Sequence, residues 1–224
     1  MHHLAIVYSI ENNALEEYEE GANNVSPEDV LDISFESAKI SNCSALKGGA
    51  IAVLPMLPRF TEPQPNKLLT LSLANSTFLE CQAFTSDFAY PFSTNSESNE
   101  SNDLGEGGAI HFFQQPVFFS AQNTSFTRCL AQNVGGAVYA NVNFGYISCV
   151  DSGEASCSMA PSSTFMFEDT TFNECGAACR GGALYVESSL EANVTAYTHV
   201  TDSKFLDCFA SPLKLGISSS DCDE

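Results

Sequence analysis

One block recurs along the chain and limits the folds that it can adopt. The pattern Phe-x-x-Cys-x-Ala begins at Phe78, Phe126, Phe172 and Phe205, and an isoleucine variant begins at Ile40. Gly-Gly-Ala and an apolar residue follow four of these five blocks, at Gly48, Gly107, Gly135 and Gly181. The second copy differs only by a polar insertion, residues 85–104. A period of this kind is the signature of a fold built by stacking one structural unit.

A third block precedes each Phe and has the alternation of a β-strand. Apolar residues stand seven and five positions upstream in most copies, as at Leu71 and Leu73 or at Phe165 and Phe167. This period of two indicates a strand with one buried face. Three positions upstream of the Phe column stand turn-forming residues: Ser37, Asn75, Asn123, Asp169 and Asp202. Each unit therefore predicts three short strands separated by a polar corner and a Gly-Gly corner.

These units predict an all-β parallel β-helix, a solenoid of about five rungs of three short strands with loop insertions. Each rung pairs with identical strands about 4.8 Å above and below, so equivalent side chains lie over one another. The expected Phe column is Phe78, Phe126, Phe172 and Phe205. The expected Cys column is Cys43, Cys81, Cys129, Cys175 and Cys208. The expected Gly column, where the backbone turns with positive φ or lies close to its neighbour, is Gly49, Gly108, Gly136 and Gly182.

The pattern divides the chain into three parts. Residues 1–28 are predicted to be a partial rung and an acidic linker, 29–217 the repeat domain and 218–224 a tail, with insertions at about 54–66, 85–104 and 141–161. The segment from His3 to Ile10 aligns with the strand that follows Gly181, with Ala5 on Ala183. Because no capping helix is evident and the fifth unit lacks Gly-Gly-Ala, we expect a piece of a longer protein with further flanking domains.

The Gly-Gly-Ala and Phe-x-x-Cys blocks resemble the repeat of the chlamydial polymorphic outer membrane proteins and their relatives in microbial eukaryotes. The resemblance covers Asp32 to about Ala210. The bacterial block commonly ends in Asn where this chain has Cys, which favours the eukaryotic relatives. The resemblance implies a right-handed β-helix and a surface domain linked to adhesion.

Charge and composition exclude several classes of partner. Eight Lys and Arg against 28 Asp and Glu give a net charge of −20, and nucleic acid requires a basic surface. No apolar run is long enough for a membrane-spanning helix. Six sequons, at Asn24, Asn42, Asn75, Asn99, Asn123 and Asn193, and nine cysteines favour an extracellular or cell-surface location. Asn123 either faces inward to cap its corner or faces outward to carry a glycan.

The cysteines have both a structural and a chemical interpretation. Stacked thiols fill an interior, whereas a zinc site has closely spaced ligand pairs, which only Cys175 and Cys179 approach. We therefore predict no metal and no cofactor. A disulfide between Cys149 and Cys157 is expected, with Cys179 to Cys208 or Cys222 as the competing pairings. An odd number of cysteines leaves at least one outside any internal pair.

The leading function is non-enzymatic recognition of an unknown surface protein or glycan, and the alternative is a polysaccharide lyase or hydrolase on a similar fold. Such enzymes combine clustered Asp with a basic residue. Asp169 and Asp202 share a column, but Arg59, Arg128 and Arg180 form no repeated pair. His111 and His199 are expected to be surface or packing residues.

Overall fold

The computed structural model describes residues 6–8, 31–53, 69–84, 105–113, 117–142, 162–188, 196–216 and 222. Within these residues nearly all regular structure is β-strand, and every strand pair is parallel. A four-residue helix, α2 (Pro212–Leu215), follows the last strand. The all-β class and the parallel pairing predicted from the repeats are confirmed.

The strands form four sheets of five, here called A to D. Sheet A contains β1 (Ile6–Tyr8), β5 (Ile51–Val53), β9 (Ile110–Phe113), β13 (Val138–Asn141) and β17 (Leu184–Glu187). Sheet B contains β2 (Leu31–Glu36), β6 (Leu69–Ala74), β10 (Val117–Gln122), β14 (Ser163–Glu168) and β18 (Ala196–Thr201). Sheet C contains β3 (Lys39–Ser41), β7 (Thr77–Leu79), β11 (Ser125–Thr127), β15 (Thr171–Asn173) and β19 (Lys204–Leu206). Sheet D contains β4 (Ser44–Ala45), β8 (Gln82–Ala83), β12 (Leu130–Ala131), β16 (Gly176–Ala177) and β20 (Phe209–Ala210).

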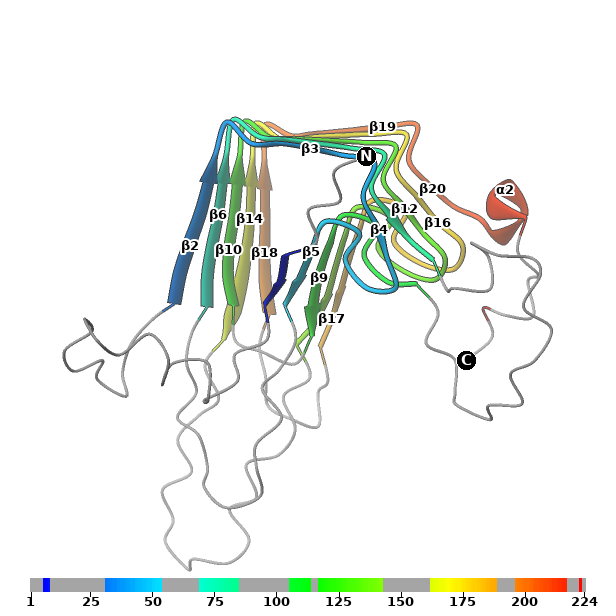
Figure 1. The fold of residues 1–224 in the computed structure, drawn as a ribbon, viewed down its shortest axis with the longest axis horizontal. Helices are drawn as coiled ribbons and strands as arrows, with labels where there is room; N and C mark the ends of the chain where they lie inside the picture. Colours follow the sequence, from blue (N-terminus) through cyan, green and yellow to red (C-terminus); the bar gives the residue numbers. More distant parts are fainter. Residues whose placement is uncertain are drawn as a thin grey trace, which may run out of the picture.

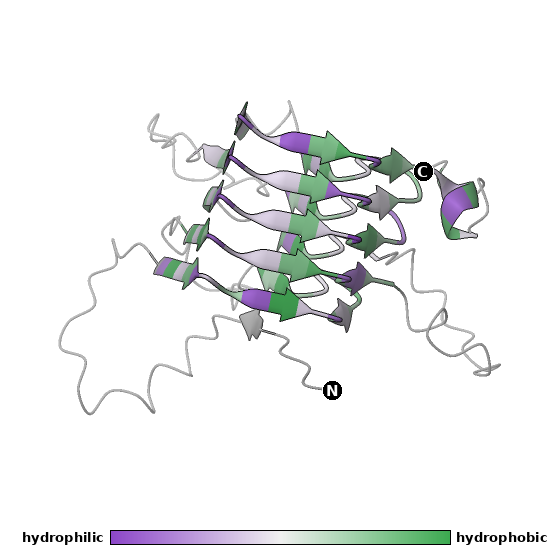
Figure 2. Cartoon of the chain, turned by 90° about the horizontal axis from the view of Figure 1, so that it is seen from above, coloured by the Kyte–Doolittle hydropathy of each residue, from purple (hydrophilic) through white to green (hydrophobic). Residues whose placement is uncertain are grey.

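A unit consists of one strand from each sheet in the order B, C, D, A, and successive units stack in register (Figures 1 and 2). The prediction of three strands per unit is wrong. The segment that carries Phe and Ala bends between them, so Phe lies in sheet C and Ala in sheet D. The residue at the bend has positive φ in every unit: Asn42, Glu80, Arg128, Glu174 and Asp207. Glu and Arg rarely adopt this conformation, so the sequence did not show the corner.

The register agrees with the alignment of the first strand. Ile6 pairs with Ile51, which pairs with Ile110; Val138 then links Ile110 to Leu184. Laying Ala5 on Ala183 places Ile6 in the Leu184 column, so β1 occupies the predicted position in sheet A.

The interior is formed by side chains that repeat from unit to unit. Phe78, Phe126 and Phe172 are fully buried, and their rings stack with centroids 4.9 and 5.1 Å apart. Alternate residues of sheet B and sheet A fill the same core. The alanines after the cysteines form a separate small cluster, Ala83, Ala131 and Ala177, rather than joining this interior. The bend before each Cys therefore divides the predicted continuous interior into two.

The Gly-Gly corners require glycine for two reasons. Gly135 has φ of 66°, which side chains with a Cβ rarely adopt. Gly136 has no such φ, but a Cβ there would lie 2.6 Å from the backbone nitrogen of Gly176 in the next unit. The first glycine thus makes the turn, and the second permits close packing of successive backbones.

The connections from sheet A to the next sheet B lie mostly outside the described residues, as do insertions 54–66 and 85–104 and all but the first two residues of 141–161. Their ends nevertheless show where they attach. Insertion 85–104 follows sheet D of the second unit, whereas the other two join sheet A to sheet B. Long connections therefore leave the stack at two different corners.

Candidate functional site

The outward side chains of sheets B and C line two strand surfaces that meet at the corner between these sheets (Figure 1). In the three middle units this outer BC face consists mainly of hydroxyl and amide side chains, with a few apolar ones. Its members are Thr70, Ser72, Ala74, Thr77, Leu79, Phe118, Ser120, Gln122, Ser125, Thr127, Thr164, Met166, Glu168, Thr171 and Asn173. Glu168 is the single charged residue among them, although the whole chain carries 28 acidic residues. The face is therefore polar but nearly uncharged.

Contacts along the columns hold several of these side chains. The Ser125 hydroxyl donates to Thr77 Oγ1 at 3.4 Å, and Gln122 Nε2 donates to Glu168 Oε2 at 3.3 Å. Strand pairing on both sides fixes the backbone beneath them. The face thus presents donors and acceptors in fixed rows, separated by the spacing of parallel strands, about 4.8 Å.

The corner between sheets B and C resolves the orientation of Asn123. Asn75 and Asn123 have positive φ and are exposed, and Asn123 Nδ2 donates to Asn75 Oδ1 at 2.7 Å. The inward capping is done by the following residue instead: Thr124 Oγ1 donates to Gln122 O at 3.0 Å. Its column neighbour Thr170 is placed in the same way, with Oγ1 donating to Ala121 O at 2.9 Å or Glu168 O at 3.1 Å. Asn123 therefore faces outward, in the orientation that a glycan acceptor needs.

The remaining sequons divide between described and undescribed parts of the chain. Asn42 is exposed at the corner between sheets C and D. Asn24, Asn99 and Asn193 lie outside the described residues. Three of the six candidate acceptors are thus at exposed corners.

The Cys column lies in the interior at the corner between sheets C and D. Cys43, Cys81, Cys129 and Cys175 are buried, and all five column thiols are free. Each Sγ lies near backbone carbonyls; Cys175 Sγ is 3.4 Å from Phe126 O and 3.6 Å from Asn173 O. Hydrogen bonding with Cys175 and Cys81, together with burial, raises the pKa of Cys129. A neutral, enclosed thiol such as Cys129 is a poor nucleophile and a poor metal ligand.

A disulfide joins Cys179 to Cys222, with their Cα atoms 5.2 Å apart. Cys222 is one of the two competing partners that the sequence left open for Cys179, and Cys208 is a free thiol. Cys149 and Cys157, the predicted pair, lie outside the described residues. The disulfide links the residues after α2 to the corner between sheets D and A of the fourth unit.

The sequence did not identify a polar and aromatic cluster on the outer side of sheet A. His111 is fully buried; its Nε2 is 3.0 Å from Glu106 Oε2, and Lys47 Nζ is 3.8 Å from the same oxygen. The His111 ring also lies 5.1 Å from the Tyr139 ring. His111 is thus a packing residue, one of the two roles expected for it, whereas His199 is exposed on β18.

Tyrosines extend this cluster to the fourth unit. Tyr139 and Tyr185 stack with centroids 5.9 Å apart, and Tyr139 OH donates to Glu187 Oε2 at 3.2 Å. Burial, with the nearby charges of Glu106 and Glu187, raises the pKa of Tyr139. The sequence contains only a weak indication of this cluster. Lys47, Glu106 and Arg180 are charged and share one column of the stack, but Val134 occupies that column in the third unit.

Asp169 and Asp202 are neighbours in one column, but neither Arg128 nor Arg180 lies with them. Asp169 and Asp202 are exposed at the corner between sheets B and C. Arg128 forms an ion pair with Glu80 at the corner between sheets C and D, and Arg180 lies beside sheet A. Arg59 is outside the described residues.

In the part of the chain that the structure describes, no group of three His, Cys, Asp or Glu side chains is placed to hold a metal ion. No helix among the same residues has the length and apolar character needed to cross a membrane. Comparison with family models, curated proteins and solved structures found no match.

Proposed function

We propose that this chain is a non-enzymatic recognition module of a secreted or cell-surface protein and binds a surface protein or glycan through the outer BC face. We propose further that it forms a right-handed parallel β-helix related to the polymorphic outer membrane protein repeat. Four parallel sheets with repeated residues in register support this architecture. The sequence resemblance supports the right hand and the surface location.

The observation that carries this proposal is the chemistry of the outer BC face. Ser and Thr hydroxyls both donate and accept hydrogen bonds, so rows of them suit an uncharged, hydroxyl-rich or amide-rich ligand. Their backbones are fixed by pairing on both sides, so little conformational entropy is lost when a ligand binds. Phe118 and Met166 add apolar contact area within the same face.

The proposal can be tested with substitutions in the centre of the face. Ser120→Arg on β10 of sheet B and Thr127→Arg on β11 of sheet C place a long charged side chain on each of the two surfaces. Each should reduce ligand binding at least about tenfold, the effect of about 1.4 kcal/mol. Ser188→Arg adds the same charge after β17, away from this face, and is the matched control. Binding is measured on glycan arrays and on cells that display candidate surface proteins.

The outcome separates the two functions considered for the chain. Binding that both face variants weaken and the control retains supports recognition through the outer BC face. Binding that neither face variant alters would refute the use of this face. Release of new reducing ends or unsaturated products from a polysaccharide would support a hydrolase or lyase instead.

The surface location has an independent test. If the chain passes through the secretory pathway of a eukaryotic cell, Asn42, Asn75 and Asn123 are exposed for glycosylation. Peptide mass spectrometry after enzymatic deglycosylation should show conversion of these Asn to Asp. Unmodified peptides at all three positions would contradict this placement.

A further inference from the structure

Two aromatic side chains stand in one outward column of sheet B. Phe118 of β10 pairs with Thr164 of β14, which in turn pairs with Tyr197 of β18. In β10 and β14 the positions on either side are buried, so Phe118 and Thr164 face outward, and the register gives Tyr197 the same direction. An outward side chain remains outside the stack however many units the stack contains.

The register also sets the distance between the two aromatic positions. Parallel strands lie about 4.8 Å apart, so the backbones of Phe118 and Tyr197 are about 9.6 Å apart, with Thr164 between them. Tyr197 is 51% exposed, and Phe118 is partly exposed. The column therefore presents a ring, a hydroxyl and a second ring in three successive units.

A second outward column lies two residues further along the same strands and is more polar. Its members in the second to fifth units are Ser72, Ser120, Met166 and His199. Ser120 follows Phe118 and His199 follows Tyr197 by two residues, about 7 Å along the strand. Each ring thus has a side chain that can form hydrogen bonds beside it on the same surface.

The outer surface of sheet B is nearly uncharged, although the chain has a net charge of −20. Among its outward residues in β6, β10, β14 and β18, Glu168 is the single acid and no Lys or Arg is present. Gln122 Nε2 donates to Glu168 Oε2 at 3.3 Å. Because no cation stands on this surface to pair with carboxylate or sulfate groups, its chemistry favours a neutral ligand over an acidic one.

The size and composition of the same surface favour a narrow ligand. Four strands of six residues cover roughly 20 by 15 Å, less than the roughly 800 Å² that each partner buries in a stable protein complex. Serine is also depleted in protein interfaces. A sugar ring has C–H bonds on its faces and hydroxyls at its rim, which match the negative face of an aromatic ring and a row of hydroxyl side chains.

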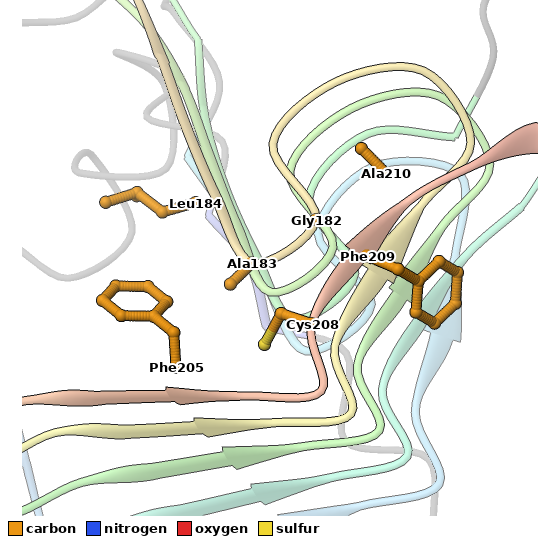
Figure 3. Close-up of a pocket in the computed structure, with 7 residues that line it drawn as sticks. All are labelled: Gly182, Ala183, Leu184, Phe205, Cys208, Phe209 and Ala210. Atoms are coloured by element: carbon orange, nitrogen blue, oxygen red, sulfur yellow. The ribbon is translucent and has the colours of Figure 1, made fainter.

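The cavity at the fifth unit has a different chemistry. Its volume is about 320 Å³, and its lining includes Ala183, Leu184 and Phe205. Among the lining residues that Figure 3 labels, Cys208 alone has a polar atom in its side chain. A thiol is a weak donor and a weak acceptor. The lining side chains of this cavity therefore do not suit the hydroxyls of a sugar, unlike the outer surface of sheet B.

We propose that the outer surface of sheet B binds a neutral, extended polysaccharide whose chain runs along the stack, across the strands. A sugar unit in such a chain is about as long as one strand spacing, so three consecutive sugars lie over Phe118, Thr164 and Tyr197. The two rings stack on the first and third sugars, and Ser120 and His199 form hydrogen bonds at their rims. This inference rests on the proposed recognition function and names its ligand.

The spacing of the rings predicts the shortest ligand that binds well. The probes are neutral cello- and xylo-oligosaccharides of two to six sugars, titrated into the whole isotope-labelled chain and followed by nuclear magnetic resonance. Affinity should rise roughly three- to tenfold from two sugars to three, because the third sugar reaches the second ring. Oligogalacturonates of the same lengths should not bind. Affinity that does not rise with length, or binding of the acidic series alone, would overturn the proposal.

Ring variants test the two stacking positions. Phe118→Ala and Tyr197→Ala should each weaken trisaccharide binding roughly three- to tenfold, whereas Tyr197→Phe keeps the ring and should retain most of the affinity. Leu79→Ala is the matched control, because Leu79 is an outward apolar residue of sheet C. All these side chains lie outside the core, so thermal melts should stay close to wild type. Unchanged binding by both alanine variants of the rings would contradict the stacking.

A short ligand separates this inference from the recognition function as a whole. A trisaccharide over Phe118 and Tyr197 does not reach sheet C, so Ser120→Arg should prevent its binding and Thr127→Arg should not. A large ligand that covers both surfaces is weakened by both changes. If the two arginine variants weaken the binding of a surface protein and no neutral oligosaccharide binds, the ligand named here is wrong and the recognition function stands.

Discussion

The Phe column offers a test of the stacked interior, because the same substitution can be made at a middle and at an end unit. Phe126 is fully buried between Phe78 and Phe172, with ring centroids 4.9 and 5.1 Å away. Phe205 is 47% exposed and, among the described residues, its ring stacks on Phe172 alone, at 4.7 Å. Phe126→Ala and Phe205→Ala therefore remove the same atoms from different surroundings.

The expected magnitudes follow from burial. A buried Phe→Ala change costs about 3–5 kcal/mol of unfolding free energy, and two lost ring contacts place Phe126→Ala in the upper part of that range. About half of Phe205 is already in water and one ring contact is lost, so Phe205→Ala should cost about 2 kcal/mol. The two variants should thus differ by roughly 2 kcal/mol.

Urea unfolding followed by circular dichroism measures this difference. Both variants should keep the wild-type dependence on urea and shift only the midpoint, Phe126→Ala further than Phe205→Ala. Equal shifts, or a larger shift for Phe205→Ala, would refute the conclusion that the Phe column is enclosed at Phe126 and partly exposed to solvent at Phe205.

Three further changes should alter stability. Gly136→Ala should cost about 1–3 kcal/mol, because its Cβ would overlap the backbone of the next unit; a thermal melt no lower than wild type would contradict this. Cys222→Ser should cost up to about 4 kcal/mol, because it opens a loop of sequence separation 43; with both chains under reductant, the variant and the wild type should unfold at the same urea concentration. Tyr139 has a raised pKa in the folded state, so the unfolded state loses its proton first and stability falls as pH rises above about 10. Tyr139→Phe should reduce that fall, as measured by urea titrations between pH 9 and 11, and an unchanged fall would show that Tyr139 is not its source.

The repeat was sufficient to predict the fold class because its columns record packing directly. The Phe, Cys and Gly columns place the same side chain at the same position in each unit, and the strand register follows them. The position of β1 in sheet A could be predicted by aligning Ala5 with Ala183. The second corner could not be predicted, because Glu80, Arg128 and Glu174 occupy positive φ there against their ordinary preference. Strand pairing above and below imposes that conformation on them.

The site was less predictable than the fold. The outer BC face follows from the strand pattern once the inward residues are known, so its Ser and Thr rows could be read from the sequence. The His111 and Glu106 contact could not, because it depends on the corner before Gly107 bringing Glu106 over sheet A. The Cys179 and Cys222 pairing depends on how the residues after α2 return to the fourth unit.

The connections between sheets A and B differ greatly in length although the strands that they join keep one register. Three residues separate β9 from β10, and 21 separate β13 from β14. The entropic cost of closing a loop grows only with the logarithm of its length, so this sevenfold difference costs about 1.7 kcal/mol. Because each strand is fixed by the units above and below it, an inserted segment changes no pairing. This corner of the stack can therefore gain or lose whole segments during evolution, while the face built from sheets B and C keeps its geometry.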